Sequence, residues 1–128
     1  MKRVLVMGDE GVGKTTIIER IGEEWGNGRW GLLFSSKEGR QIQLFFEESR
    51  PRGDADILAV IFVFDITKRQ SFNRIKEYYY PEFQRLNPRS EVFSLLVSNK
   101  LDFESQRTVM QDEVLLFTNI DRRVCLRN

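Results

Sequence analysis

The 128-residue sequence contains no histidine and a single cysteine, Cys125. The absence of histidine excludes imidazole catalysis and histidine metal sites, which leaves oxygen ligands for any divalent cation. One cysteine cannot form an internal disulfide and is typical of a reducing compartment, so we expect a cytoplasmic protein. The longest apolar run, residues 57–64, has eight residues, whereas a membrane-spanning helix needs about 20. We therefore expect no membrane span in this chain.

An excess of charge of either sign is also missing. The 20 lysines and arginines balance 19 aspartates and glutamates, for a net charge of +1. This balance gives no electrostatic reason to expect nucleic acid or an anionic membrane as the main partner. No repeat, low-complexity tract or linker interrupts the sequence, so we expect residues 1–128 to form one domain.

The strongest signal that is present is the run G-D-E-G-V-G-K-T at residues 8–15, which matches the phosphate-binding pattern G-x-x-x-x-G-K-[S/T]. It follows an apolar run, residues 4–7, and precedes a segment, residues 16–21, with apolar residues at helical spacing. In such a loop, glycines let backbone N–H groups surround phosphate oxygens, Lys14 reaches the β and γ phosphates as the catalytic residue, and Thr15 ligates Mg²⁺. We predict binding of a nucleoside di- or triphosphate. The nucleotide-binding residues predicted here are Gly8, Glu10, Gly11, Val12, Gly13, Lys14, Thr15 and Thr16.

Strand-like and helix-like segments alternate along the chain, which predicts a three-layer α/β fold with a doubly wound, mostly parallel sheet. Two strands joined by a glycine-containing turn at residues 37–40 are expected at the edge of that sheet. The apolar spacing of residues 70–86 predicts a helix with Tyr79 on its apolar face, and Pro81 should kink it near residues 78–80. The expected strands are residues 4–7, 32–35, 41–46, 57–64, 92–97 and 124–126, and the expected helices are residues 16–21, 70–86 and 109–117.

A second motif, Asn99-Lys100-Leu101-Asp102, follows the expected strand 92–97, at the sheet edge where doubly wound folds bind ligands. As an isolated string it also fits an Asn-Lys turn with an Asp helix cap. Its chemistry suits guanine, because Asp102 can accept hydrogen bonds from N1–H and the N2 amino group, which adenine does not offer there. Asn99 is predicted to contact the other base edge, and the stem of Lys100 to lie along the ring. We therefore predict GTP or GDP, with Mg²⁺, as the ligand.

The phosphate loop, the segment 55–72 and the motif 99–102 together resemble the Ras-like small GTPases over essentially the whole chain. The resemblance implies a nucleotide-binding regulatory protein of signalling or trafficking that acts with a protein effector or regulator. Within that superfamily, the runs at residues 8–14, 80–86 and 117–121 are similar to the amino-terminal GTPase domain of Miro proteins.

Several features of this family are missing from the sequence. Residues 25–31 contain no switch threonine to sense the γ-phosphate, and the nearest hydroxyls, Ser35 and Ser36, are expected in a strand. The family's D-x-x-G is absent, although Glu47 stands near its acidic position. The ten residues between the strands that end at residue 46 and begin at residue 57 are too few for a regular helical crossover. The second switch helix should therefore be a stub or absent.

The carboxyl-terminal part of the family pattern is also shortened. The sequence stops at Asn128, before the family's final helix. We therefore expect the sheet face beside strands 4–7 and 92–97 to be uncovered, so that either a partner covers it or the chain is incomplete.

Glu10 occupies a loop position that is glycine in many small GTPases, and its side chain would crowd the attacking water and an arginine supplied in trans. No glutamine is placed to orient that water. Three hypotheses follow. The chain is a GTPase with slow hydrolysis, a nucleotide-binding pseudo-GTPase that acts as an interaction module, or a different phosphate-loop enzyme such as a small kinase.

Overall fold

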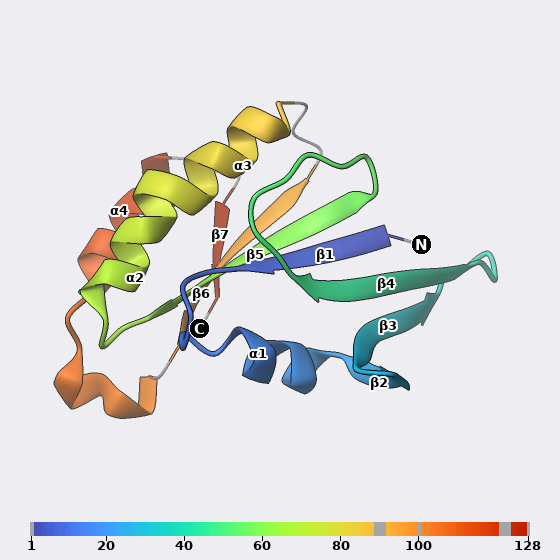
Figure 1. Ribbon diagram of the computed structural model, residues 1–128, viewed down its shortest axis with the longest axis horizontal. Coiled ribbons are helices and arrows are strands. Elements are labelled where there is room, and N and C mark those ends of the chain that lie inside the picture. Colours follow the sequence, from blue (N-terminus) through green and yellow to red (C-terminus); the bar gives the residue numbers. More distant parts are fainter. Residues whose placement is uncertain (1, 89–91, 100, 121–123, 128) are drawn as a thin grey trace.

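A sheet of seven strands runs through the computed structural model, which describes residues 2–88, 92–99, 101–120 and 124–127. The strands are β1 (Lys2–Met7), β2 (Glu23–Gly26), β3 (Arg29–Ser35), β4 (Gln41–Glu48), β5 (Ile57–Asp65), β6 (Phe93–Asn99) and β7 (Val124–Arg127). Their spatial order is β2-β3-β4-β1-β5-β6-β7 (Figure 1). The five strands from β4 to β7 in this order pair in parallel, and β2, β3 and β4 pair antiparallel. The mostly parallel sheet confirms the predicted α/β class.

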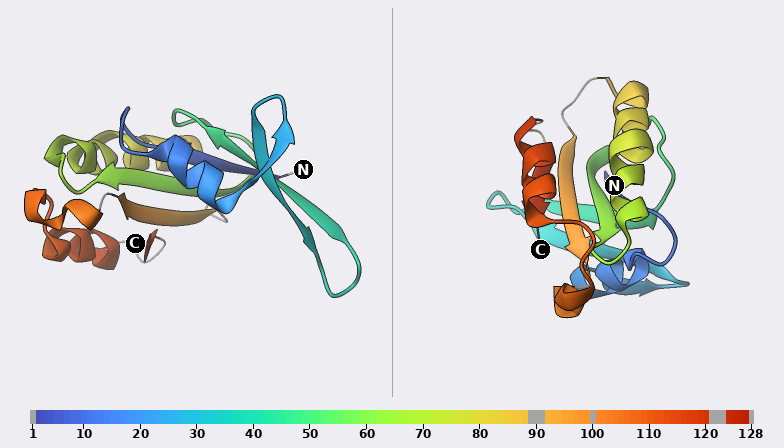
Figure 2. Two further views of the ribbon diagram at one scale, coloured as in Figure 1. Left: turned by 90° about the horizontal axis from the view of Figure 1, so that it is seen from below. Right: turned by 90° about the vertical axis from the view of Figure 1, so that its left-hand side faces the viewer.

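Helices lie on both faces of this sheet (Figure 1 and Figure 2). They are α1 (Lys14–Ile21), α2 (Arg69–Arg74), a π-helical segment (Ile75–Tyr79), α3 (Tyr80–Leu86), a 3-10 segment (Leu101–Gln106) and α4 (Gln111–Ile120). Ile18 of α1 packs into a smaller core on one face, whereas Phe83 of α3 and Val114 of α4 pack into a larger core on the other. No helix in the described part of the chain is long and apolar enough to cross a membrane.

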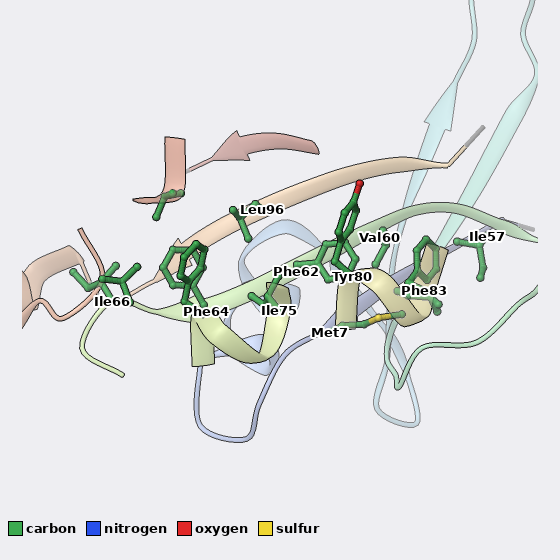
Figure 3. Close-up of a cluster of buried hydrophobic side chains, with 14 residues drawn as sticks. Met7, Ile57, Val60, Phe62, Phe64, Ile66, Ile75, Tyr80, Phe83 and Leu96 are labelled. Carbon is green, nitrogen blue, oxygen red and sulfur yellow. The ribbon is translucent and has the colours of Figure 1, made fainter. Parts of the chain in front are cut away.

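Side chains of the central strands alternate between the two cores, as a strand period of two requires. In β5, Phe62 and Phe64 belong to the larger core, whereas Ile61 and Val63 belong to the smaller one. The ring of Phe62 meets that of Tyr80 nearly edge-on at 5.7 Å between centroids (Figure 3). β5 is therefore buried on both faces, which explains why its sequence is a continuous apolar run.

The helix predicted over residues 70–86 is present, but the expected kink takes the form of a wide turn. Pro81 has no N–H to donate, and in the π-helical turn before it the N–H of Tyr80 bonds to the carbonyl of Ile75. The backbone stays helical there, with φ −61° and ψ −49° at Tyr79. As a result Tyr80 takes the buried position that follows Ile75, whereas Tyr79, predicted on the apolar face, is only partly buried against the larger core.

The edge of the sheet also differs from the prediction. The hairpin of β3 and β4 is not the edge, because β4 pairs with β1 and the outer position belongs to β2, which was not predicted. β2 and β3 are joined through Asn27 and Gly28, which both have positive φ, 56° and 71°. Asn-Gly is the pair that favours this tight hairpin turn, so the signal for β2 was present in the sequence.

Two expectations about shortened regions have different outcomes. Residues 49–56 form no helix, which confirms that the second switch helix is absent. The sheet face beside β6 is partly open, as expected, since Phe93 is 70% exposed. The prediction for the same face of β1 was wrong, because α1 buries Val4 and Val6 there.

Candidate functional site

The phosphate loop, residues 8–13, leaves the end of β1 and enters α1 (Figure 1). Gly13 caps α1 with φ 101°, and a Cβ atom on it would lie 2.0 Å from Nδ2 of Asn99. That Asn99 amide donates a hydrogen bond to the carbonyl of Val12 at 2.7 Å. The two sequence motifs therefore meet in space, and Asn99 at the end of β6 closes the loop.

Lys14 opens α1, and its ammonium group folds back over the loop. Nζ donates to the carbonyl oxygens of Gly8 at 2.5 Å and Asp9 at 3.0 Å. The first N–H groups of a helix have no acceptor within it, and the helix dipole adds partial positive charge at that end. The start of α1, together with Lys14, is therefore suited to an anion such as phosphate.

An open cavity of about 390 Å³ lies over the loop. Every predicted loop residue except Gly8 and Val12 lines it, and the Val12 side chain is buried in the smaller core instead. Val12 thus offers only its backbone to the site. The lining residues are Glu10, Gly11, Gly13, Lys14, Thr15, Thr16 and Glu48.

Glu48, the last residue of β4, is a site residue that was not predicted. Its carboxylate accepts a hydrogen bond from the Thr15 hydroxyl at 2.9 Å. Glu47, which was placed near the family's acidic position, faces away and pairs with Arg3 and Arg52 at 2.9 Å each. The alternation of β4 could have identified Glu48, because it shares a strand face with Phe46, which packs in the core beneath α1.

The oxygens of Thr15 and Glu48 fit the coordination that Mg²⁺ prefers. Mg²⁺ binds hard oxygen ligands, and often takes only one or two from the protein and the others from water and phosphate. Among the described residues, no cluster of three or more acidic or cysteine side chains offers a metal site elsewhere. The predicted metal ligand Thr15 therefore has a carboxylate partner, Glu48, within hydrogen-bond distance.

Other predicted residues are not brought to the loop. Lys100 lies outside the described residues, as does the side chain of Asp102, so their contact with a base stays a prediction. Ser35 ends β3, and the hydroxyl oxygen of Ser36 accepts a hydrogen bond from the N–H of Arg40. The turn that joins β3 to β4 lies away from the phosphate loop (Figure 1 and Figure 2).

Known proteins are similar to this chain in sequence. The model of the Ras family matches residues 43–121, which is more than half of the chain. The chain belongs to the Ras family. Ras-related protein Rab-13 of Canis lupus familiaris is 28% identical to it over 88% of this chain and 63% of the relative. Ras-related protein RABC2a of Arabidopsis thaliana is 27% identical over 87% of this chain and 60% of the relative.

Ras-related protein Rab-18 of Lymnaea stagnalis is a further relative, 26% identical over 90% of this chain and 64% of its own length. This Ras-family chain thus spans less than two thirds of the length of these three relatives. The narrower likeness to the amino-terminal domain of Miro proteins stays a prediction.

Proposed function

We propose that this Ras-family chain binds GTP and GDP with Mg²⁺, hydrolyses GTP slowly or not at all, and acts in signalling or trafficking through a protein effector or regulator. The observation that carries the proposal is the cavity over residues 8–15, in which Lys14, Thr15 and Glu48 converge. A loop of this kind with a lysine and a hydroxyl serves phosphates. The near-zero net charge supports neither nucleic acid nor a charged membrane as partner.

Each residue of the cavity has a distinct part in this proposal. Lys14 exchanges its bonds to two loop carbonyls for bonds to phosphate oxygens, and the backbone N–H groups of the loop bind the same anion. Thr15 and Glu48 supply oxygens on the side of β4. A bound Mg²⁺ would neutralise phosphate charge there.

Selection of guanine rests on the motif at residues 99–102. Asn99 already holds the loop through Val12, so the strand end that carries the motif lies beside the phosphate site. Asp102 would accept the two guanine donors, and Lys100 would lie along the ring. In this arrangement one short segment both supports the phosphate loop and chooses the base.

Slow hydrolysis follows from what lines the cavity. Positioning and charge stabilisation supply most of phosphoryl-transfer catalysis. The segment 22–56 is where the family's switch threonine and D-x-x-G are missing, and among the described residues it contributes only Glu48 to the cavity lining. Glu10 is exposed at the mouth of the loop, where it would crowd an attacking water. The same observations support the alternative of a pseudo-GTPase whose nucleotide is structural.

The test is to identify by mass spectrometry the nucleotide released from freshly purified protein, and then to measure single-turnover hydrolysis with Mg²⁺. Retained GTP with no turnover would favour the pseudo-GTPase, whereas GDP with slow turnover would favour the enzyme. Competition of labelled GTP by excess ATP tests the base. Equal displacement by ATP and GTP would favour a different phosphate-loop enzyme, and no nucleotide binding at all would contradict the proposal.

The expected cytoplasmic location is part of this proposal, and it rests on the lone Cys125. A fractionation experiment with the protein expressed in its own cells would test it. Recovery in an oxidising compartment would contradict it.

A further inference from the structure

Asp9, the second residue of the phosphate loop, is held by the helical run 69–86, which consists of α2, the π-helical segment and α3. Its carboxylate oxygen Oδ1 accepts a hydrogen bond from the Tyr79 hydroxyl at 3.0 Å and lies 3.4 Å from Nε of Arg74. The Arg74 guanidinium also lies over the rings of Tyr78 at 4.8 Å and Tyr79 at 5.6 Å. The Asp9 side chain is 27% exposed. This cluster joins two segments that are 70 residues apart in the sequence.

The backbone of the same residue touches Lys14. The carbonyl oxygen of Asp9 accepts a hydrogen bond from Nζ of Lys14 at 3.0 Å. Rotation of the Asp9 peptide would move this carbonyl and also the next N–H group, which belongs to the part of the loop that lines the cavity. A fixed Asp9 side chain therefore limits the positions of both the lysine and the loop amides.

We propose that Tyr79 and Arg74 are positioning residues for the nucleotide site, which act on the phosphate loop and on Lys14 through Asp9. This inference rests on the proposed nucleotide binding and names residues that its loop motif does not contain. Neither side chain lines the cavity, so their effect on a ligand passes through the loop.

The π-helical turn explains why Tyr79 is available for this contact. In a regular α-helix the residue four positions after the buried Ile75 would share its core-facing side. The wide turn moves that place to Tyr80, which is 7% exposed in the larger core. Tyr79 is thereby turned to the margin of the core, where its ring packs and its hydroxyl reaches Asp9. Single π-helical turns are frequent at functional sites.

Charge gives Arg74 a second effect. A carboxylate in a loop that binds phosphate would repel the ligand unless a cation compensates it. Arg74 is paired with Asp9, so it removes that penalty while it holds the side chain. Burial, followed by the hydrogen bond to Asp9, raises the pKa of Tyr79 above its ordinary value, so the hydroxyl keeps its proton for donation.

The experiment compares Tyr79→Phe with Tyr78→Phe in the full chain. Tyr79→Phe removes only the hydroxyl that binds Asp9, and Tyr78→Phe removes the hydroxyl of a more exposed neighbour. Hydrogen exchange of residues 8–15 is measured in nucleotide-free protein, and GDP dissociation is measured separately. We expect exchange and dissociation both to be about fivefold faster in Tyr79→Phe, the size of one hydrogen bond to a partly exposed charge. Tyr78→Phe should match the wild type.

Two further variants test the route through Asp9. In Asp9→Ala, adding Tyr79→Phe should change loop exchange much less than Tyr79→Phe does alone, because each change removes the same hydrogen bond. Arg74→Lys keeps a cation near Asp9 and should retain more of the GDP affinity than Arg74→Gln.

The outcomes separate the two proposals. If the wild type binds no nucleotide, the proposed function fails, and loop exchange in nucleotide-free protein still decides whether Tyr79 positions the loop. Equal loop exchange in Tyr79→Phe and Tyr78→Phe would overturn the inference, whatever the affinity for GDP. Equal GDP dissociation from both variants, with faster loop exchange in Tyr79→Phe, would also overturn the inference, because Tyr79 would then position the loop without any effect on the bound nucleotide.

Discussion

The phosphate loop and the segment between α1 and β5 differ in how they are held. The loop is fixed from three directions, by Asn99, by Lys14 and by the Asp9 contacts to the helical run. The segment 22–56 instead forms two hairpins whose outer part carries exposed apolar residues, with Phe34 and Ile42 paired across the strands. Only Glu48, at its inner end, reaches the cavity over the loop.

This difference separates two tasks that a phosphate-binding site can perform. Binding an anion needs backbone N–H groups, a cation and rigid support, and the loop with Lys14 has all three. Sensing a γ-phosphate needs side chains on a segment that rearranges when the phosphate is present. In this chain the first set of features is intact, whereas the segment 22–56 contributes one carboxylate.

The largest effect is expected from Lys14→Ala. Loss of an ammonium group that bonds phosphate oxygens should weaken GTP and GDP binding about 100-fold, as expected for two charge-assisted hydrogen bonds. Isothermal titration or displacement of a fluorescent nucleotide measures the change. Lys37→Ala, in the hairpin turn, is the control and should bind as the wild type does. An unchanged dissociation constant for Lys14→Ala would count against the loop as the phosphate site.

The next effect compares two glycines with positive φ, one in each region. At Gly13 a Cβ would lie 2.0 Å from Nδ2 of Asn99, whereas at Gly39, in the hairpin turn, no atom lies within 4 Å. We expect Gly13→Ala to lower the free energy of unfolding by about 3 kcal/mol, from backbone strain and displacement of Asn99, and Gly39→Ala by about 1 kcal/mol, from strain alone. Urea unfolding of the nucleotide-free protein measures both. Equal losses would contradict the close fit between Asn99 and the loop.

A smaller effect is expected from Glu48→Gln. If Glu48 and Thr15 share the metal site, the Mg²⁺ concentration needed to retain nucleotide should rise about tenfold. Nucleotide release measured across a Mg²⁺ series tests this. Glu47→Gln is the matched control, because that carboxylate pairs with Arg3 and Arg52 and should leave the Mg²⁺ requirement unchanged. The reverse result would restore Glu47 as the acidic residue of the site.

The smallest effect concerns a surface ion pair outside both regions. The hydrogen bonds from Arg69, and then from the N–H of Met110, lower the pKa of Glu113 from its ordinary 4.5 to about 2. A lowered pKa adds stability above about pH 4.5, which is lost as the pH falls toward 2. Glu113→Gln should therefore be slightly less stable than the wild type at neutral pH, and the difference should disappear as the pH falls through about 2.

Thermal unfolding across this pH range measures the effect. Glu38→Gln, in the exposed hairpin turn, should show no such convergence with the wild type. A difference for Glu113→Gln that stays constant with pH would contradict the role of its charge.

The parts of the fold that follow from local pattern could be predicted. The continuous apolar run of β5 and the helical spacing after Lys14 each reflect neighbours a few residues apart. The phosphate loop was found for the same reason, because its glycines, Lys14 and Thr15 are contiguous. β2 was missed although Asn27-Gly28 carries a local turn signal, so that error was one of interpretation.

The remaining errors have a different origin. The burial of Tyr80 was not predicted because a regular helix was assumed, and the wide turn before Pro81 shifts the buried position from Tyr79 to Tyr80. The choice between Glu47 and Glu48 depends on which face of β4 lies under α1, and the pairing of β4 with β1 decides it.

By itself the sequence determined the α/β class and the loop with Lys14 and Thr15, because both depend on residues close together in the chain. Only the tertiary structure decided that Asn99 of β6, Glu48 of β4 and Tyr79 of the helical run contact this loop. The physical reason is that these contacts join residues between 33 and 87 positions apart. These residues come together because of the order of the strands in the sheet and because of the rotation that the π-helical turn gives to residues 75–80.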